Sequence, residues 1–177
     1  MRALFLALAA VLAFGVTAPQ AQAQGAQSAP ASWKTFRYPD LHVIFRAPAE
    51  AQPQVQRNTA QVSGVTVSDD HIVVIGKPDV AYMIGVSDWT GNSNAMNIDG
   101  VAPAAVKGMS GQIVGPVRTL SWSGGEAREY DASTTNLTIR SRVILVNRRL
   151  VQVMVLCTGG VLPPDAQAFL ESVTVMP

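Results

Sequence analysis

The stretch Leu120–Thr158, LSWSGGEAREYDASTTNLTIRSRVILVNRRLVQVMVLCT, carries most of the densest apolar sequence in the chain. Turn residues at Ser123-Gly124-Gly125 and at Asn147-Arg148 divide it into runs of strand length. Together with the residues just before it, the stretch predicts consecutive strands over 113–122, 126–132, 137–146 and 149–157. An antiparallel sheet is therefore expected at the centre of the fold.

A tight turn at Asn147-Arg148 would also fix the register of the last two of these strands. Leu145 would then face Leu150, and one face would carry Leu137, Ile139, Leu145, Leu150, Met154 and Leu156. The opposite face would carry Arg140, Arg142 and Arg149 beside Val151, Val153 and Val155. Because both faces are partly apolar, we expect the sheet to be covered on both sides, with the core on the leucine face.

Further strands are predicted on both sides of this stretch, with two short helices. The strands fall at 33–38, 41–45, 61–67, 72–75 and 81–86, with a loop at 50–59, a turn at 68–71 and a mobile loop at 88–97. Asp99 is expected to cap a helix over 101–109 that packs Val101, Ala105 and Met109 on the sheet. A second helix over 163–172 would bury Ala166, Phe169, Leu170 and Val173. Helices inserted among antiparallel strands predict an α+β domain with a central twisted sheet.

The N-terminus has the features of a secretory signal peptide. Arg2 precedes an apolar run over residues 3–16, and Ala21-Gln22-Ala23 fits the small-residue cleavage pattern. We therefore predict a signal peptide over 1–23, with a second cleavage site possible after Ala18, then a flexible tether over 24–32 and one domain over 33–177. The apolar run is too short to span a bilayer comfortably, so the mature chain is expected to be periplasmic or secreted, without a transmembrane segment.

The charge and the cysteine usage narrow the classes of function. The chain has 13 Lys and Arg against 12 Asp and Glu, so removal of Arg2 with the signal peptide leaves the mature chain neutral. A neutral chain argues against nucleic-acid binding, which normally requires a basic excess. Cys157 is the single cysteine, which excludes an intramolecular disulfide, and its apolar neighbours predict a small buried strand residue.

Three segments in this order resemble the PsbP/Mog1-like fold family. Phe36–Pro48 (FRYPDLHVIFRAP) resembles its opening strand and turn, and Leu120–Tyr130 (LSWSGGEAREY) is similar to the glycine turn and acidic strand of bacterial members. The strands over 138–155 and the ending Phe169–Val175 (FLESVTV) resemble its last hairpin and terminal helix. The resemblance implies a central antiparallel sheet with helices against it and a non-catalytic accessory, assembly or interaction role. It transfers no functional residue and no cofactor.

The arginines Arg140, Arg142 and Arg149 form the main candidate site. On one sheet face they could bind an anion or an acidic partner, since guanidinium groups pair well with carboxylates and phosphates. Glu126, Glu129 and Asp131 on the neighbouring strand offer the alternative of cross-strand ion pairs on a solvated face. Trp89, beside the predicted mobile loop, is a candidate contact residue or a packing residue.

The two histidines provide weaker candidates. His42, predicted on a strand, or His71, predicted in a turn, could act as a general base, but no motif places a nucleophile beside either. Asp69, Asp70 and His71 could ligate a metal, or the carboxylates could bond local amides in the turn. We therefore assign no catalytic residue, no metal site and no cofactor.

Three functions remain open on the sequence alone. The first is a non-enzymatic exported accessory or interaction protein with an unidentified protein partner, which could also form a homodimer through a sheet face or edge. The second is a periplasmic binder of small molecules or anions that uses the arginine face and the Trp89 loop. The third is a hydrolase that uses His42 or His71.

Overall fold

A computed structural model describes residues 33–49, 51–62, 65–90 and 97–176. The predicted signal peptide (1–23) and tether (24–32) lie outside the described residues.

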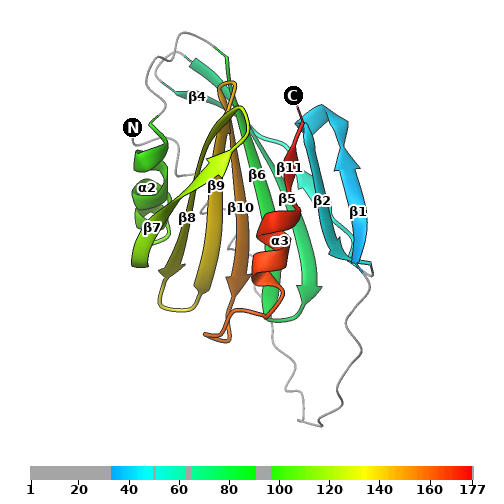
Figure 1. The fold of residues 1–177 in the computed structure, drawn as a ribbon, viewed down its shortest axis with the longest axis vertical. Helices are drawn as coiled ribbons and strands as arrows, with labels where there is room; N and C mark the ends of the chain where they lie inside the picture. The colour runs from blue at the N-terminus through cyan, green and yellow to red at the C-terminus, as the bar shows by residue number, and fades with distance from the viewer. Residues whose placement is uncertain (1–32, 50, 63–64, 91–96, 177) are drawn as a thin grey trace.

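Eight strands form the larger sheet: β3 (Gln54–Gln56), β4 (Thr59–Val62), β5 (Val65–Lys77), β6 (Val80–Thr90), β7 (Gln112–Trp122), β8 (Gly125–Ser133), β9 (Thr138–Val146) and β10 (Arg149–Cys157). Their order is β3-β5-β6-β10-β9-β8-β7, with β4 also paired to β5, and the neighbours run antiparallel (Figure 1). The predicted α+β class with a central antiparallel sheet is confirmed.

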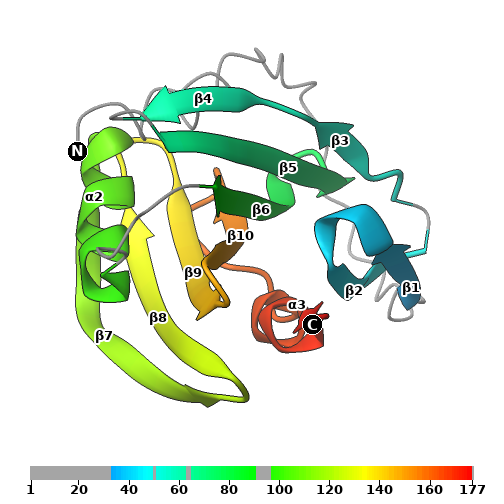
Figure 2. The same ribbon diagram turned by 90° about the horizontal axis from the view of Figure 1, so that it is seen from above.

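One face of the large sheet is covered by a helix and a second, smaller sheet. The smaller sheet has the order β1-β2-β11, formed by β1 (Trp33–Tyr38), β2 (Val43–Pro48) and β11 (Thr174–Val175). Figure 2 shows the large sheet curving around these strands and helix α3 (Ala166–Ser172). The main core lies between them and includes Phe45, Tyr82, Ile144, Val153, Phe169 and Leu170. As predicted, α3 buries Ala166, Phe169 and Leu170.

Helix α2 (Val101–Gly108) packs on the opposite face of the sheet, after the 3-10 turn η3 (Ile98–Gly100). A second cluster forms there from Ile98, Ala102, Val106, Tyr130, Ala132, Ile139, Val143 and Leu150. Successive residues of β8 alternate between the two clusters, because side chains of a strand point to opposite faces. Ala127 belongs to the main core, whereas Tyr130 belongs to the α2 cluster. The sheet is thus covered on both sides, as the sequence predicted.

The predicted hairpin register is confirmed. Leu145 lies opposite Leu150 and Ile139 opposite Leu156. Asn147 and Arg148 both adopt positive φ angles, of 48° and 67°, which a two-residue turn between twisted strands requires.

The prediction that the leucine face holds the core was wrong. The main core includes Ile144, Val151, Val153 and Val155, which share the arginine face, while the leucine face supplies two smaller clusters. Apolar residues alternate on both faces of this hairpin, so the periodicity could not tell which face is more deeply covered. The packing of α3 and of the small sheet decides it.

The predicted turn at 68–71 does not exist, because these residues lie inside the continuous strand β5. β6 pairs with β5 along one edge while β3 and β4 pair with it along the other, so the backbone is hydrogen-bonded through this polar stretch. The long-range pairing overrides the turn propensity of Asp69 and Asp70. The predicted loop over 50–59 likewise contains β3 and the first residue of β4.

Three other boundaries also differ from the predictions. Leu41 and His42 do not begin a strand: Leu41 ends a 3-10 turn, and His42 follows it with φ 55°. β6 continues to Thr90, into the predicted mobile loop, and residues 91–96 lie outside the described residues. Asp99 does not cap α2, because the N-cap is Gly100. The predicted packing of α2 on the sheet is confirmed: Ala105 is buried, and Val101 and Met109 pack against the cluster on this face.

Candidate functional site

Arg142 is a buried structural residue of the candidate arginine face. Its Nε and Nη2 donate to Glu129 Oε2 at 2.9 and 2.5 Å, and its Nη1 donates to the carbonyl oxygen of Leu170 at 3.1 Å. The Arg142 and Glu129 side chains are only 8% and 4% exposed. The carbonyls of the last helical turn lack partners within the helix, so Arg142 caps α3 and ties it to the sheet.

A second arginine reaches the same carboxylate from the edge strand. Arg118 Nη2 donates to Glu129 Oε1 at 2.7 Å, and the Arg118 side chain is 48% exposed. Glu129 therefore lies between a buried and a half-exposed guanidinium. Arg118 was not among the three arginines predicted to lie together, although its position opposite Glu129 in the β7 and β8 ladder follows from the glycine turn between these strands.

Arg140 and Arg149 each form a bidentate ion pair, but with different strands. Arg140 donates to both oxygens of Asp131 on β8, at 2.7 and 3.1 Å, and this bond raises the pKa of the guanidinium. Arg149 donates to both oxygens of Asp88 on β6, at 2.6 and 3.0 Å. The proposed cross-strand pairing thus holds for Glu129 and Asp131, while Asp88 was missed because β6 lies far from β10 in sequence.

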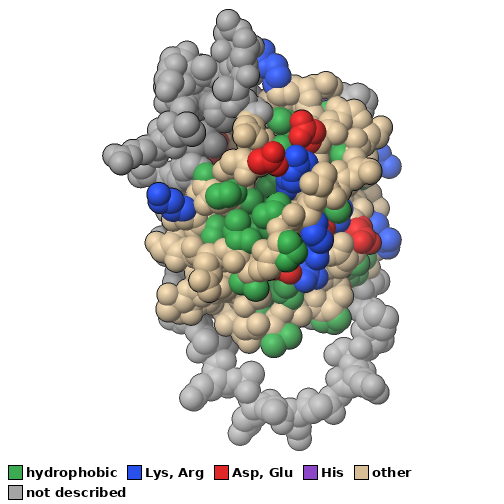
Figure 3. Space-filling view, turned by 60° about the vertical axis from the view of Figure 1, so that its left-hand side comes forward, with side chains coloured by type: hydrophobic (Ala, Val, Ile, Leu, Met, Phe, Trp, Pro, Cys, Tyr) green, Lys and Arg blue, Asp and Glu red, His purple; other side chains and the backbone are tan. Residues whose placement is uncertain are grey.

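The structure does not bring all three candidate arginines together. Arg149 lies opposite Val146, which is six residues along β9 from Arg140. At about 3.3 Å per residue, these positions are about 20 Å apart. Glu126, the third predicted carboxylate, lies on the other face and accepts a hydrogen bond from Arg128, whose Nε binds Asp99 at 2.7 Å. The space-filling view shows alternating basic and acidic groups beside an apolar area (Figure 3).

Trp89 lies near the end of β6, where its backbone is opposite Val67 of β5. It is therefore part of the sheet instead of a separate loop. Its side chain lies outside the described residues, so its predicted role as a contact residue stays a prediction.

Asp69 and His71 form a buried polar contact on the α2 side of the sheet. His71 Nε2 lies 3.3 Å from Asp69 Oδ1, and the His71 side chain is 1% exposed. Ser87 Oγ donates to the same Asp69 oxygen at 2.9 Å. Ser87 therefore bonds the carboxylate and not the imidazole. In a catalytic triad the serine hydroxyl is instead hydrogen-bonded to the histidine, so this arrangement differs from that of a serine nucleophile and its base.

Asp70, the third metal candidate, does not join the contact between Asp69 and His71. Asp70 adjoins Asp69 and His71 in β5, and its side chain points to the other face because directions alternate along a strand. Within the described parts of the chain, no group of three or more His, Cys, Asp or Glu side chains could hold a metal ion.

Replacing Asp69 with asparagine should reduce the acid sensitivity of the fold. Burial alone raises the pKa of the Asp69 carboxyl, but the hydrogen bonds and charge of His71 and the bond from Ser87 outweigh burial and lower it. A carboxyl with a lowered folded pKa contributes stability above its unfolded pKa of about 4, and this contribution is lost as pH falls through the folded value. Urea unfolding at several pH values below 5 should show a shallower loss of stability in Asp69→Asn than in wild type. Parallel curves would contradict this.

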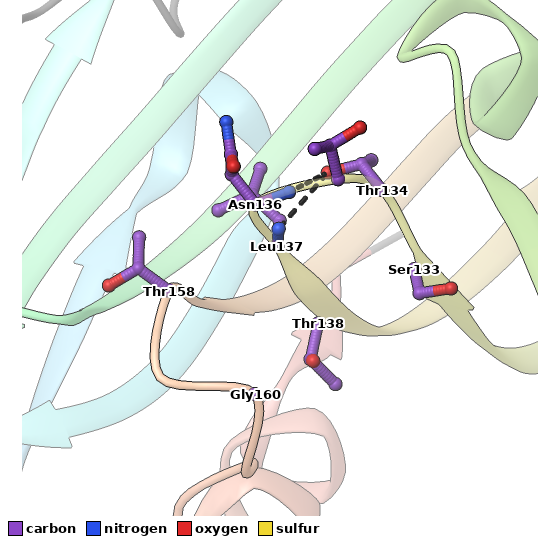
Figure 4. Close-up of a pocket in the computed structure, with 8 residues that line it drawn as sticks. Ser133, Thr134, Asn136, Leu137, Thr138, Thr158 and Gly160 are labelled. Carbon is purple, nitrogen blue, oxygen red and sulfur yellow. Dashed lines mark hydrogen bonds between the residues drawn. The ribbon is translucent and has the colours of Figure 1, made fainter.

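A shallow polar depression lies where the turn between β8 and β9 approaches the loop after β10 (Figure 4). Its volume is about 490 Å³, and its lining consists of Ser133, Thr134, Thr135, Asn136, Leu137, Thr138, Thr158 and Gly160. Thr134 Oγ1 accepts hydrogen bonds from the backbone N–H groups of Asn136 and Leu137, at 3.2 and 3.0 Å. The lining carries hydroxyl and amide groups without a titratable side chain, so it offers hydrogen bonds but no acid or base.

The comparisons with known proteins identify the fold. No family model matches the sequence, and no curated protein matches it significantly. The solution structure of cyanobacterial PsbP (CyanoP) from Synechocystis sp. PCC 6803 superimposes with a TM-score of 0.56 at 10% identity, covering 86% of this chain and 98% of that one. The crystal structure of PA94 from Pseudomonas aeruginosa, a protein of unknown function, superimposes with a TM-score of 0.44 at 14% identity. The match covers 78% of this chain and 92% of that one. Neither described α-helix is long and apolar enough to cross a membrane.

Proposed function

From a PsbP-like fold, we propose that this protein acts after export, with its signal peptide cleaved near Ala23, as a non-enzymatic accessory or interaction protein. One surface of the described residues supports the proposal. We call it the arginine strip: Arg118, Arg140 and Arg142 with the carboxylates Glu129 and Asp131. Three guanidinium groups face two carboxylates, which leaves a positive excess at the edge of the sheet.

The strip is partly accessible at its outer members. The side chains of Arg118 and Arg140 are 48% and 27% exposed, whereas that of Arg142 is buried. Val114 of the edge strand β7 lies opposite Asp131 of the strip and is 50% exposed. A guanidinium has five N–H donors, so an ion pair with one carboxylate leaves donors for a second anionic group. An acidic surface of a protein partner fits this combination of charge and apolar area.

Replacing Arg118 and Arg140 together with alanine should lower partner capture several-fold. The Arg140–Asp131 pair lies near the surface, where such pairs contribute up to about 1 kcal/mol, and the buried Glu129 keeps its pair with Arg142 when Arg118 is removed, so the domain should stay folded. Crosslinking in the native envelope, followed by identification of the captured proteins, measures the effect. Arg142 is unsuitable for this test because it is buried and caps α3.

Arg57→Ala is the matched control, since it removes one exposed arginine that pairs with Asp40 away from the strip. Unchanged capture by the double variant would refute the strip as the contact surface. The same crosslinking would reveal a homodimer as a product of twice the mass of the mature chain.

The positive excess also favours a second function, the binding of small anions. In that case inorganic phosphate or citrate should raise the melting temperature of wild type and not of the Arg118→Ala, Arg140→Ala variant. An equal rise in both proteins, or none in either, would contradict anion binding at the strip.

A further inference from the structure

The edge strand β7 presents an uncovered backbone edge. Within the part of the chain that the structure describes, β7 is the last strand of the large sheet and pairs with β8 alone (Figure 2). Each residue of β7 is exposed or only partly buried. A free edge offers its backbone N–H and C=O groups to another strand, so folded proteins normally protect it with a proline, a bulge, a charge or a covering segment.

Such protection is present only in the first half of β7. Pro116 and the bulge between Val114 and Arg118 interrupt the regular edge there. The second half, Arg118–Trp122, pairs regularly with β8 up to the turn. Its single charged side chain, Arg118, is already paired with Glu129. This regular half of the edge is therefore open to a partner strand.

The turn after β7 determines which backbone groups point outward. Trp122 and Gly125 flank the two-residue turn and lie opposite each other, so they form a hydrogen-bonded pair of the ladder. Hydrogen-bonded and non-hydrogen-bonded pairs alternate along an antiparallel ladder. Ser121 and Thr119 therefore belong to non-hydrogen-bonded pairs, and their N–H and C=O groups point away from β8.

The backbone of the segment Arg118–Trp122 is complementary to a second copy of itself. Leu120 is the middle residue of the segment, so a two-fold axis at Leu120 pairs this whole half of β7 and leaves out the bulge and the turn. In that antiparallel register, Thr119 of each copy lies opposite Ser121 of the other. The outward N–H and C=O groups of both strands then meet as hydrogen-bonded pairs.

The side chains also fit this register. Arg118 of each copy would lie opposite Trp122 of the other, on the face of the main core, where Leu120 and Trp122 are only partly buried. The bond to Glu129 uses the N–H edge of the Arg118 guanidinium and leaves its flat face for the indole ring. The two leucines at the axis would cover each other, and the hydroxyl side chains of the other face would form cross-strand pairs.

We propose that this protein associates with a second copy of itself through residues 118–122 of β7, as an antiparallel pair around a two-fold axis at Leu120. A two-fold contact satisfies both free edges at once and closes the assembly. The inference does not depend on the proposed interaction role, because the backbone of β7 makes the contact. One short strand from each copy gives a small interface, below about 1,200 Å², so the dimer should dissociate on dilution.

Sedimentation velocity of the mature chain over a range of concentrations measures the association. Wild type should change from monomer to dimer as the concentration rises. Thr119→Pro removes an outward N–H group without breaking a bond to β8, so the circular dichroism spectrum should stay unchanged while the dissociation constant of the dimer rises at least about tenfold. Arg140→Ala should dimerise as wild type does, because Arg140 lies on β9. That control separates the contact from the arginine strip.

Disulfide formation tests the register. Leu120→Cys places two thiols at the two-fold axis, in a non-hydrogen-bonded pair with Cα atoms about 4.5 Å apart, which is within the range of a disulfide. Mild oxidation should therefore give a covalent dimer. Val114→Cys is the matched control, since Val114 lies on the same strand outside the paired half, is 50% exposed and should stay monomeric. Cys157 is buried, so wild type gives the background.

Three results would overturn the proposal. The first is a wild type that stays monomeric over the whole concentration range. The second is a folded Thr119→Pro variant that dimerises as strongly as wild type. The third is equal crosslinking of Leu120→Cys and Val114→Cys, or none in either, and this comparison decides if Thr119→Pro does not fold.

Discussion

Gly125→Ala should lower the free energy of unfolding by about 3 kcal/mol, the upper end of the cost of overpacking. A Cβ at this position would lie 2.1 Å from the carbonyl oxygen of Leu145 and 2.8 Å from Val146 Cγ2. The carbonyl belongs to the backbone of β9, so it cannot move aside as a flexible side chain could. β8 would have to separate from β9 at the start of their ladder. Urea unfolding monitored by tryptophan fluorescence measures the change through the midpoint and the slope.

Gly100→Ala is the matched control for that variant. Gly100 is the N-cap of α2, its φ is −80°, and a Cβ there would meet nothing within 4 Å. Its stability should therefore change by less than about 0.5 kcal/mol, as for most surface substitutions. Equal stability of the Gly125→Ala variant and wild type would show that β8 and β9 are not held at this separation.

Glu129→Leu should cost about 3–5 kcal/mol, because it leaves the Arg142 guanidinium buried without its carboxylate. Arg142 would keep its bond to the Leu170 carbonyl, but it would lose both hydrogen bonds to Glu129. Arg118 is half-exposed and can be hydrated instead, so it should add little to the loss. A lower urea midpoint at an unchanged slope would measure the effect.

The double variant Glu129→Leu, Arg142→Met tests whether the loss of stability in Glu129→Leu comes from the unpaired charge of Arg142 or from the loss of the contact itself. Removing both charges restores an apolar interior, so the double variant should be more stable than Glu129→Leu alone. It should not fully reach wild type, since the Leu170 carbonyl loses its donor. If the double variant is no more stable than the single one, the unpaired arginine is not the cause of the loss. Asp40→Asn, at an exposed pair, should change little.

The strands from β7 to β10 could be predicted because their signals are local. Glycines and Asn147-Arg148 mark the turns, and alternating residues mark the strands, so the register followed from the turn position. The β5 region was misread because Asp69 and Asp70 have turn propensity, and only pairing with β3, β4 and β6 keeps them in a strand. These partners could not be assigned from short polar segments.

In the candidate site, too, contacts between neighbours in sequence could be predicted, whereas contacts between distant segments could not. Glu129 and Asp131 could be predicted as partners of Arg142 and Arg140, because a hairpin joins adjacent strands. Asp88 could not, since the contact of β6 with β10 brings together residues 61 positions apart. The burial of His71 also had no sequence signal, because it depends on residues from neighbouring strands.

The sequence by itself determined the α+β class, the order of the last four strands, the register of the final hairpin and the face shared by the arginines. These features follow from hydrophobic periodicity, turn residues and the alternation of side chains along a strand. Each of these signals depends on residues that are close together in the sequence. Only the tertiary structure decided which face of Leu120–Thr158 is the main core and which arginine is buried. Both faces carry similar apolar patterns, and the difference arises when α3 and the β1-β2-β11 sheet pack on one of them, which places Arg142 beneath the end of α3.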